Sequence, residues 1–307
     1  MSLPVNLQFR PLHADFGAEA SGLDLTQPLS PAQVEAVDRA MDRYGVLLFR
    51  GQLLTPDQQM AFTRQFGPLD AGFRRVRKGP GIGPHRFDYD ELADISNVQA
   101  DGSIAQRESR KIVGNIANQL WHADSSFQRP RAKYSMLHAV VLTSWGGSTE
   151  YADMRNAWDR LDARMKAHLR PLVAEHFALH SRFMLGDDDY TPEQIAAIPP
   201  ARWPLVQRHS GSGREHLYIG AHARAIDGMT VAEARMLLAD LLEHATHPDH
   251  VYRHEWQVGD LVIWDNRCML HRGRAYDLSE RRELRRSTTL DTESEHRFTP
   301  EEALRPN

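Results

Sequence analysis

Several features that would point to other classes of protein are missing from this chain. Cys268 is its only cysteine, so no intrachain disulfide can form, and a reducing compartment is the natural one. No apolar run approaches the roughly 20 residues that a membrane-spanning helix needs, and the first residues lack the pattern of a signal peptide. The net charge of −4 gives no general reason to expect nucleic-acid binding. These absences predict a cytoplasmic protein without a membrane or nucleic-acid partner.

The chain also lacks internal repeats and the Gly-x-Ser-x-Gly turn of many hydrolases. Cys268 has no flanking motif of a thiol enzyme, and we expect it to be a small core residue. With 307 residues, of which 41% are hydrophobic, the chain can bury a sizeable core. We expect one domain over residues 1–307.

Local signals predict helices and strands in an irregular order. Ser30-Pro31 and Thr55-Pro56 each place a capping side chain before a proline at the first helical position. Gly45 is typical of the end of the first helix. Further helices are expected near 154–169, from 191 and near 230–246. Strands are expected at 46–49, 136–142, 216–219, 251–256, 260–264 and 284–290. Without regular alternation of strand and helix, a doubly wound sheet is disfavoured, and a mainly β sandwich or barrel with flanking helices is favoured.

Two regions are poor in regular pattern. Residues 70–118 include Lys78-Gly79-Pro80-Gly81-Ile82-Gly83-Pro84, which can hold neither a helix nor a central strand. Such a long irregular stretch is typical of a lid or binding loop, so we expect a lid over the active site. The tail from Asp291 is charged, and we expect it to be loosely held.

A His-x-Asp triplet, His122-Ala123-Asp124, is the main chemical signal. In an extended segment the side chains at i and i+2 point to the same side, so both residues can address one ion. Two imidazoles and a carboxylate form the ligand set of the non-haem iron(II) oxygenases. The alternative is that His122 is a hydrogen-bonded core histidine and that Asp124 caps a turn with Ser125 or Ser126. On these residues alone the two interpretations are about equally favoured.

His271 is a candidate third ligand, seven residues after the expected strand at 260–264. Other histidines compete with it, and nothing in the local sequence separates them: His209, His216, His222 and His254. Three of these, His209, His216 and His222, could line a pocket, although surface placement is the expectation for at least two of them.

Longer stretches of the sequence resemble a known family. They include Asn118-Gln119-Leu120-Trp121-His122, Trp203-Pro204-Leu205-Val206, Ile219-Gly220-Ala221-His222, Trp264-Asp265-Asn266-Arg267 and Arg281-Arg282-Glu283-Leu284-Arg285-Arg286. In these, over roughly residues 5 to 291, the chain resembles the taurine dioxygenase family of Fe(II)/2-oxoglutarate-dependent enzymes, and most closely its herbicide-degrading members. The resemblance implies a double-stranded β-helix, or jelly roll, with helices outside.

The resemblance also implies roles for individual residues. His122, Asp124 and His271 would bind Fe(II). Thr149 and Arg282 would hold the distal carboxylate of 2-oxoglutarate, and Arg286 the anionic head of the primary substrate. Arginine suits both anions because its guanidinium is a planar fork that can bind a carboxylate at two points. Arg282 and Arg286 are four apart, so a strand would place both on one side. The competing interpretation is a solvated basic run of Arg281, Arg282, Arg285 and Arg286, and for Thr149 a turn residue.

The herbicide-degrading members accept aryloxyacetates, which combine an aromatic ring, an ether oxygen and a carboxylate. Beside Arg286, the resemblance places Arg75, Asn118 and Ser125 at the substrate pocket. An exposed basic loop is the alternative for Arg75. The segment Gly79-Pro80-Gly81-Ile82-Gly83-Pro84 departs from those relatives at the place of the expected lid, which leaves ring-size and chiral preference open.

The implied reaction uses Fe(II), 2-oxoglutarate and O2. It hydroxylates the carbon next to the ether oxygen of a 2,4-dichlorophenoxyacetate-like substrate and yields a phenol, glyoxylate, succinate and CO2. One alternative is the same chemistry on another organic anion, such as a sulfonate (taurine among them), an alkyl sulfate or a natural aryl-acid. A more distant one is a non-catalytic jelly-roll protein that binds a metal. The expected partner is a small anionic aromatic substrate, and homo-oligomer formation is left open.

Overall fold

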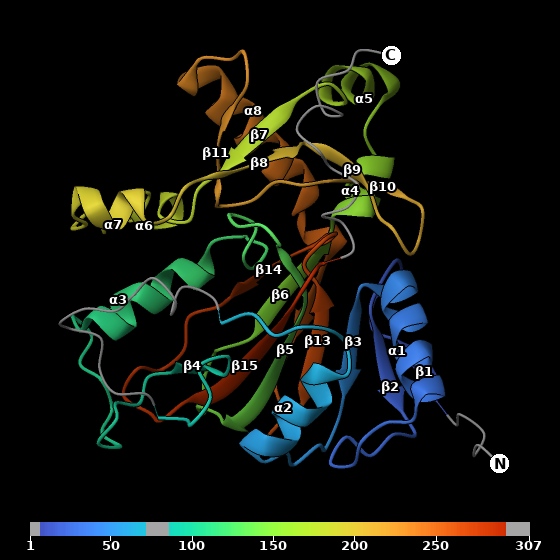
Figure 1. Cartoon of the computed structure of the whole chain (residues 1–307), viewed down its shortest axis with the longest axis vertical. Coiled ribbons are helices and arrows are strands. Elements are labelled where there is room, and N and C mark those ends of the chain that lie inside the picture. The colour runs from blue at the N-terminus through green and yellow to red at the C-terminus, as the bar shows by residue number, and fades with distance from the viewer. Residues whose placement is uncertain (1–6, 72–85, 293–307) are drawn as a thin grey trace.

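The protein is mainly β-structure with helices packed outside it (Figure 1). The computed structural model describes residues 7–71 and 86–292. The strands are β1 Gln8–Pro11, β2 Ala18–Ser21, β3 Val46–Phe49, β4 Ala93–Ser96, β5 Ala132–Val141, β6 Thr149–Asp153, β7 Val173–His176, β8 Ala201–Pro204, β9 Val206–Arg208, β10 Glu215–Leu217, β11 Ala223–Ile226, β12 Val251–His254, β13 Leu261–Asp265, β14 Met269–Gly273 and β15 Glu283–Leu290.

The α-helices are α1 Pro31–Tyr44, α2 Pro56–Arg64, α3 Arg110–Ile116, α4 Met154–Asp159, α5 Ala163–Leu169, α6 His180–Phe183, α7 Pro192–Ala196 and α8 Val231–Ala245, with short 3-10 turns η2 Ala117–Gln119 and η3 Pro248–His250. Within the described ranges, none of the helices is both long and apolar enough to traverse a membrane.

Two sheets enclose the central core. The larger has the order β1-β2-β3-β13-β5-β15-β4, and a smaller one has the order β12-β6-β14. Leu137 and Val262 of the large sheet share one buried cluster with Tyr151 and Met269 of the small sheet. The opposite face of the large sheet is covered by α1 and α2, through buried residues such as Met41 and Phe62 (Figure 1). This two-layer arrangement with helices outside is the architecture expected of a jelly roll.

The capping signals locate the first helices correctly. Ser30 caps α1 and Thr55 caps α2, each through a reciprocal capping box, and Gly45 ends α1 with a φ of 69°. The helix expected over 154–169 is instead two helices. Asp162 accepts a hydrogen bond from the backbone N–H of Met165 and starts α5, which breaks the run.

The irregular region holds some regular structure. It contains β4, which pairs with β15 at the edge of the large sheet, and α3 followed by η2. The expected lid segment 79–84 lies outside the described residues, as does most of the tail. Asp291, where the loose tail was expected to begin, is buried and pairs with Arg131 at 3.1 Å.

Candidate metal centre and adjoining pockets

The backbone brings the two distant parts of the motif together. His122 lies just after η2, and His271 lies in the middle of β14. The two residues form an isolated antiparallel bridge in which each backbone N–H donates to the other's carbonyl, at 3.0 and 2.9 Å. The pairing brings His271 next to the triplet and sets the two imidazoles side by side, 4.2 Å apart between ring centroids.

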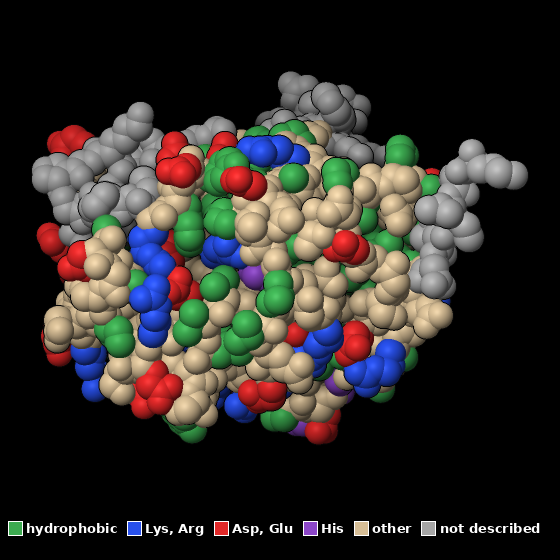
Figure 2. All heavy atoms as spheres, turned by 90° about the horizontal axis from the view of Figure 1, so that it is seen from below, with side chains coloured by type: hydrophobic (Ala, Val, Ile, Leu, Met, Phe, Trp, Pro, Cys, Tyr) green, Lys and Arg blue, Asp and Glu red, His purple; other side chains and the backbone are tan. Residues whose placement is uncertain are grey.

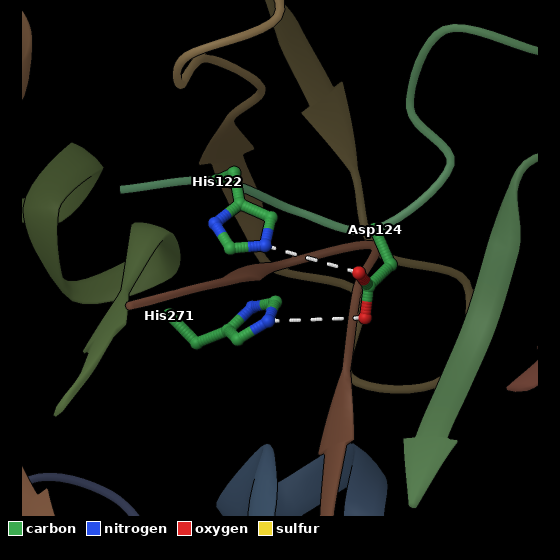
Figure 3. Close-up of side chains that lie close together, drawn as sticks. All are labelled: His122, Asp124 and His271. Atoms are coloured by element: carbon green, nitrogen blue, oxygen red, sulfur yellow. Dashed lines mark ion pairs between the residues drawn. The ribbon is translucent and has the colours of Figure 1, made fainter. Parts of the chain in front are cut away.

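His122, Asp124 and His271 form a compact, buried triad (Figure 3). The Nε2 atoms of His122 and His271 lie 3.9 and 3.8 Å from the Asp124 carboxylate oxygens. The side chains point toward a common space, and each residue is at most 6% exposed. This is the arrangement that one ion with three ligands on one face requires.

The protonation states suit a cation. Burial alone would raise the pKa of Asp124, but the Arg286 guanidinium, which donates to this carboxylate, outweighs it and holds that pKa well below its usual value. Burial lowers the pKa of His122, and burial followed by the neighbouring His122 lowers that of His271. The carboxylate is therefore charged and both imidazoles are neutral at physiological pH, which leaves lone pairs for a metal.

Neighbouring groups fix the orientation of these side chains. His122 Nδ1 lies 2.7 Å from the Leu120 carbonyl, a contact that assigns the proton to Nδ1 and leaves Nε2 as the donor atom to a metal. Ser135 Oγ donates to Asp124 Oδ2 at 2.7 Å, and Asn266 Oδ1 accepts from the Asp124 backbone N–H at 2.9 Å. The donor set, its charge and its oriented tautomer all fit a divalent transition metal.

A second trio has ligand-type atoms close together but does not resemble a metal site. In the group His209, Asp265 and Cys268, both Asp265 oxygens already accept hydrogen bonds from Arg267, and one also contacts His209 Nε2 at 3.0 Å. Burial raises the pKa of the Cys268 thiol well above its usual value. This cluster is an internal ion pair, and Cys268 is the core residue that was expected.

A cavity of about 80 Å³ adjoins the triad on one side. Its walls include His122, His271, Thr149, Arg282 and Arg286. Arg282 is 7% exposed, donates to the Gly147 carbonyl at 2.8 Å and lies over the Tyr276 ring at 4.6 Å. Among the described residues no carboxylate pairs with it. Burial lowers its pKa to about 10, only partly opposed by Tyr276. A buried cation without a counter-ion calls for an anionic ligand.

Thr149 lies at the same end of this cavity. It begins β6, and its Oγ1 accepts a hydrogen bond from Trp256 Nε1 at 3.1 Å. Because the indole uses the acceptor side of the hydroxyl, the Thr149 proton is oriented away from Trp256 and can be donated to a ligand. Arg282 and Arg286 also line the same cavity, as their four-residue spacing on an extended segment predicts.

A second cavity of about 200 Å³ also adjoins the triad. Asn118, Ser125 and Arg286 line it, together with His122, Asp124 and Phe127. Asn118, His122 and Arg286 line the first cavity as well, so the two cavities adjoin each other at the triad. Arg286 Nη1 donates to Asp124 Oδ1 at 2.5 Å, while its buried Nε has no partner among the described residues. Arg75 lies outside the described residues.

Ser125 has a local role in addition to its position. Its backbone has a φ of 50°, and its hydroxyl donates to Asp70 Oδ2 at 2.6 Å. The hydroxyl proton of Ser125 is therefore directed at Asp70 and not into the cavity. Only the lone pairs of Ser125 Oγ can accept a hydrogen bond from another group.

The expectations for the remaining basic residues were partly wrong. His209, His216 and His222 are all buried, so surface placement of two of them is incorrect. His222 lines the larger cavity and contacts the Phe127 ring at 4.9 Å. The run at 281–286 is not a solvated basic surface either, since Arg282 and Arg285 are both 7% exposed. The sequence did not predict Ser135 and Asn266, which hold Asp124, or Arg182, which lines the larger cavity. The family stretch at 264–267 was the only signal for Asn266.

Comparisons with known proteins agree with this geometry. Residues 8–288 match the family described as "Taurine catabolism dioxygenase TauD, TfdA family". The alpha-ketoglutarate-dependent 2,4-dichlorophenoxyacetate dioxygenase of Cupriavidus pinatubonensis (strain JMP 134 / LMG 1197) is 59% identical over 281 residues, which cover 92% of this chain and 96% of that protein. The (S)-phenoxypropionate/alpha-ketoglutarate-dioxygenase of Sphingobium herbicidovorans is 38% identical, with 89% and 91% covered.

Among solved structures, the crystal structure of AAD-2 in complex with Mn(II) and N-oxalylglycine superposes with a TM-score of 0.89. It is 44% identical, and the match covers 93% of this chain and 98% of that one. N-oxalylglycine is an analogue of 2-oxoglutarate, so a similar protein holds both a divalent metal and a ligand of the co-substrate's shape.

Proposed function

Because this chain belongs to the TauD, TfdA family of dioxygenases, we propose that it hydroxylates the carbon next to the ether oxygen of an aryloxyacetate such as 2,4-dichlorophenoxyacetate. The chain is an Fe(II)- and 2-oxoglutarate-dependent dioxygenase, and O2 is its second co-substrate. One observation supports the assignment of the site: a single cavity is lined by His122 and His271 of the triad and by Arg282, a buried cation with no carboxylate partner among the described residues.

His122, Asp124 and His271 would hold the metal. When bound there, Fe(II) supplies O2 activation coupled to the decarboxylation of 2-oxoglutarate, which gives succinate, CO2 and a hydroxylated substrate. Arg282 would neutralise the distal carboxylate of 2-oxoglutarate, and the Thr149 hydroxyl would donate to the same group. Both residues lie in the cavity that His271 opens into.

The larger cavity would receive the substrate. Arg286 is shared by both cavities and would bind the substrate carboxylate through the part of its guanidinium that Asp124 does not occupy. Phe127 offers an apolar wall for the aromatic ring. Asn118 and the lone pairs of Ser125 would contact the polar part, and Arg75 stays a prediction. Held in this way, the carbon between the ether oxygen and the carboxylate faces the triad. Its hydroxylation gives a hemiacetal, which separates into a phenol and glyoxylate.

A cytoplasmic location is also proposed, on the strength of the single buried cysteine and the substrate class. No nucleic-acid partner is proposed. On the face that Figure 2 shows, Lys and Arg side chains are interspersed with Asp and Glu. Homo-oligomer formation is left for measurement in solution.

A panel assay tests the substrate class. With Fe(II), 2-oxoglutarate and O2, succinate release should be fastest with 2,4-dichlorophenoxyacetate, compared with both phenoxypropionate enantiomers, taurine and an alkyl sulfate. The Arg286→Gln variant should raise KM for the aryloxyacetate, whereas Arg281→Gln should not, because Arg281 is half exposed and pairs with Glu283. Faster turnover of a sulfonate or sulfate would overturn the substrate assignment. No consumption of 2-oxoglutarate with any anion would favour the non-catalytic alternative.

A further inference from the structure

A chain of aromatic rings leads away from the metal position through residues that do not line the larger cavity, where the substrate would bind. Trp264 of β13 lies 4.4 Å from the His271 ring, centroid to centroid, and Tyr151 of β6 lies 6.3 Å from it. Tyr151 and Trp264 are 5.8 Å apart. Both rings are fully buried between the two sheets. The rings thus form a continuous path that begins at a predicted metal ligand (β6, β13 and β14 in Figure 1).

The path continues to a tyrosine that solvent reaches. Tyr252 of β12 stacks on Tyr151 with ring centroids 6.2 Å apart and planes at 19°. Tyr252 is partly exposed, and it lines neither of the two cavities beside the triad. It therefore lies at the outer end of the series, one ring away from a residue in contact with His271.

Tyr252 differs from Tyr151 in having a proton acceptor. Its hydroxyl lies 3.0 Å from His254 Nδ1, and His254 Nε2 lies 3.1 Å from Asp260 Oδ2. The Asp260 carboxylate requires the His254 proton to be on Nε2, so Nδ1 is free to accept from the phenol. The hydroxyl of Tyr151, in contrast, has no hydrogen-bond partner in the described part of the chain.

The acceptor is itself supported. Asp260 also binds Arg50 Nη1 at 2.6 Å and the Gln257 backbone N–H at 2.8 Å, and it is fully buried. The fixed carboxylate would stabilise an imidazolium at His254. A phenol with a positioned base loses its proton at the moment it loses an electron, because the proton has only a hydrogen-bond distance to move. Tyr252 is therefore the residue of the series that can be oxidised to a stable neutral radical.

We propose that Tyr252, through Tyr151 and Trp264, delivers electrons to the metal site when 2-oxoglutarate is consumed without a bound substrate. The proposal rests on the proposed function, which supplies the oxidant. In a coupled turnover two oxidising equivalents are consumed at the substrate C–H bond. Without substrate they remain at the site and can attack the protein itself.

The electrons and protons balance as follows. Tyr252 gives one electron inward along the rings, and its phenolic proton moves to His254 Nδ1, which leaves a neutral tyrosyl radical beside an imidazolium. A one-electron reductant in solution, such as ascorbate, then reduces the radical, and His254 returns the proton. Two such passes, with two protons from solvent, release the second oxygen atom of O2 as water and return the site to its starting state.

The test uses the full chain loaded with Fe(II) and 2-oxoglutarate, exposed to O2 without substrate and freeze-quenched. Electron paramagnetic resonance should show a tyrosyl radical in the wild type, with its pattern altered by deuterated tyrosine. The radical should be lost in Tyr252→Phe and retained in Tyr44→Phe, a control that packs in a different hydrophobic cluster from these rings and keeps its ring packing on Phe9. Tyr252→Phe should keep the wild-type initial rate with substrate, but without substrate it should inactivate after severalfold fewer turnovers, and ascorbate should no longer protect it.

A second measurement does not depend on a variant. In the wild type, a nitroso spin trap should form its adduct on the peptide that contains Tyr252, as mapped by mass spectrometry. An adduct on another tyrosine, an unchanged radical in Tyr252→Phe, or consumption of 2-oxoglutarate with no tyrosyl radical would each overturn the inference. Measuring 2-oxoglutarate in the same samples separates failure of this inference from failure of the proposed function. If 2-oxoglutarate is not consumed, the proposed function is overturned, and the source of the oxidant with it.

Discussion

Replacing Arg282 with methionine should weaken co-substrate binding without destabilising the free protein. The side chain is a buried cation with no carboxylate partner among the described residues, and burial lowers its pKa from the usual value to about 10. That shift corresponds to roughly 3 kcal/mol of unfavourable free energy for the charged form in the folded state. Methionine keeps much of the length and apolar volume of the stem and removes the charge.

Two interactions would be lost with the guanidinium. The hydrogen bond to the Gly147 carbonyl and the contact with the Tyr276 ring together are worth about 1–3 kcal/mol. Subtracting this loss from the roughly 3 kcal/mol gained by removing the buried charge leaves about 0–2 kcal/mol. We therefore expect the free energy of unfolding without ligand to be unchanged, or raised by up to about 2 kcal/mol, in Arg282→Met.

Binding should change far more. Removing one partner of a buried ion pair costs about 3–5 kcal/mol, so the affinity for 2-oxoglutarate should fall roughly 150- to 4,000-fold. At a ligand concentration of 100 Kd, the wild type should gain about 2.7 kcal/mol of stability. At the same concentration the variant should gain almost none.

Urea unfolding with and without Mn(II) and N-oxalylglycine measures both effects, and isothermal titration gives the affinity directly. Arg281→Met is the matched control, because its side chain is 48% exposed and should change neither quantity. The Arg282→Met variant could instead lose more than about 1 kcal/mol of stability and bind 2-oxoglutarate like the wild type. That result would show that the Arg282 charge stabilises the fold and does not bind the co-substrate.

Three further variants test other parts of the site. Asp124→Ala should bind Mn(II) too weakly to detect by calorimetry and should abolish succinate release, and wild-type turnover in this variant would refute the ligand assignment. Ser135→Ala removes the hydroxyl that donates to Asp124 and accepts from Asn266 Nδ2, and it should weaken metal binding roughly 10–100-fold; an unchanged Kd would show that the hydrogen bond from the Asp124 backbone N–H to Asn266 suffices. Burial lowers the pKa of His176 to about 3, so the unfolded state binds its proton first, and stability should fall by up to about 1.4 kcal/mol per pH unit as pH drops below about 6.5. In acid unfolding curves, the dependence of stability on pH should be less steep in His176→Gln than in the wild type, and unchanged in His168→Gln, where the side chain is exposed. Equal slopes in His176→Gln and the wild type would show that His176 does not cause the loss of stability.

The sequence predicts best what is determined within a few residues. Ser30, Thr55 and Gly45 end helices through contacts with their own neighbours, and the structure has all three as expected. The break in 154–169 was also local, since Asp162 is a capping residue, but the hydrophobic pattern continued across it and hid the signal. Strands β6 and β14 were not expected, because their charged residues Glu150 and Arg272 pair across the two strands instead of alternating with apolar ones.

The site depended on contacts that no local pattern encodes. His271 was one of several competing histidines until its backbone was seen to pair with that of His122. The four arginines of residues 281–286 look alike in the sequence, yet they have three environments. Arg281 is half exposed, Arg282 lies in the cavity, and Arg285 is buried on the other side, donating to the Leu54 carbonyl at 2.5 Å.

The charges around the triad limit which substrates can bind. Arg282 has no carboxylate partner among the described residues and Arg286 shares Asp124, so two cations face one carboxylate while both histidines are neutral. A divalent metal and the dianion of 2-oxoglutarate cancel each other, so Arg286 remains a cation at the triad for a carboxylate, a sulfonate or a sulfate ester. Asp70, Asp90, Glu91 and Arg182 also line the larger cavity, and charge does not distinguish these three singly charged head groups from one another. The walls of the larger cavity, with Phe127 and His222 among them, therefore have to select the aromatic ring.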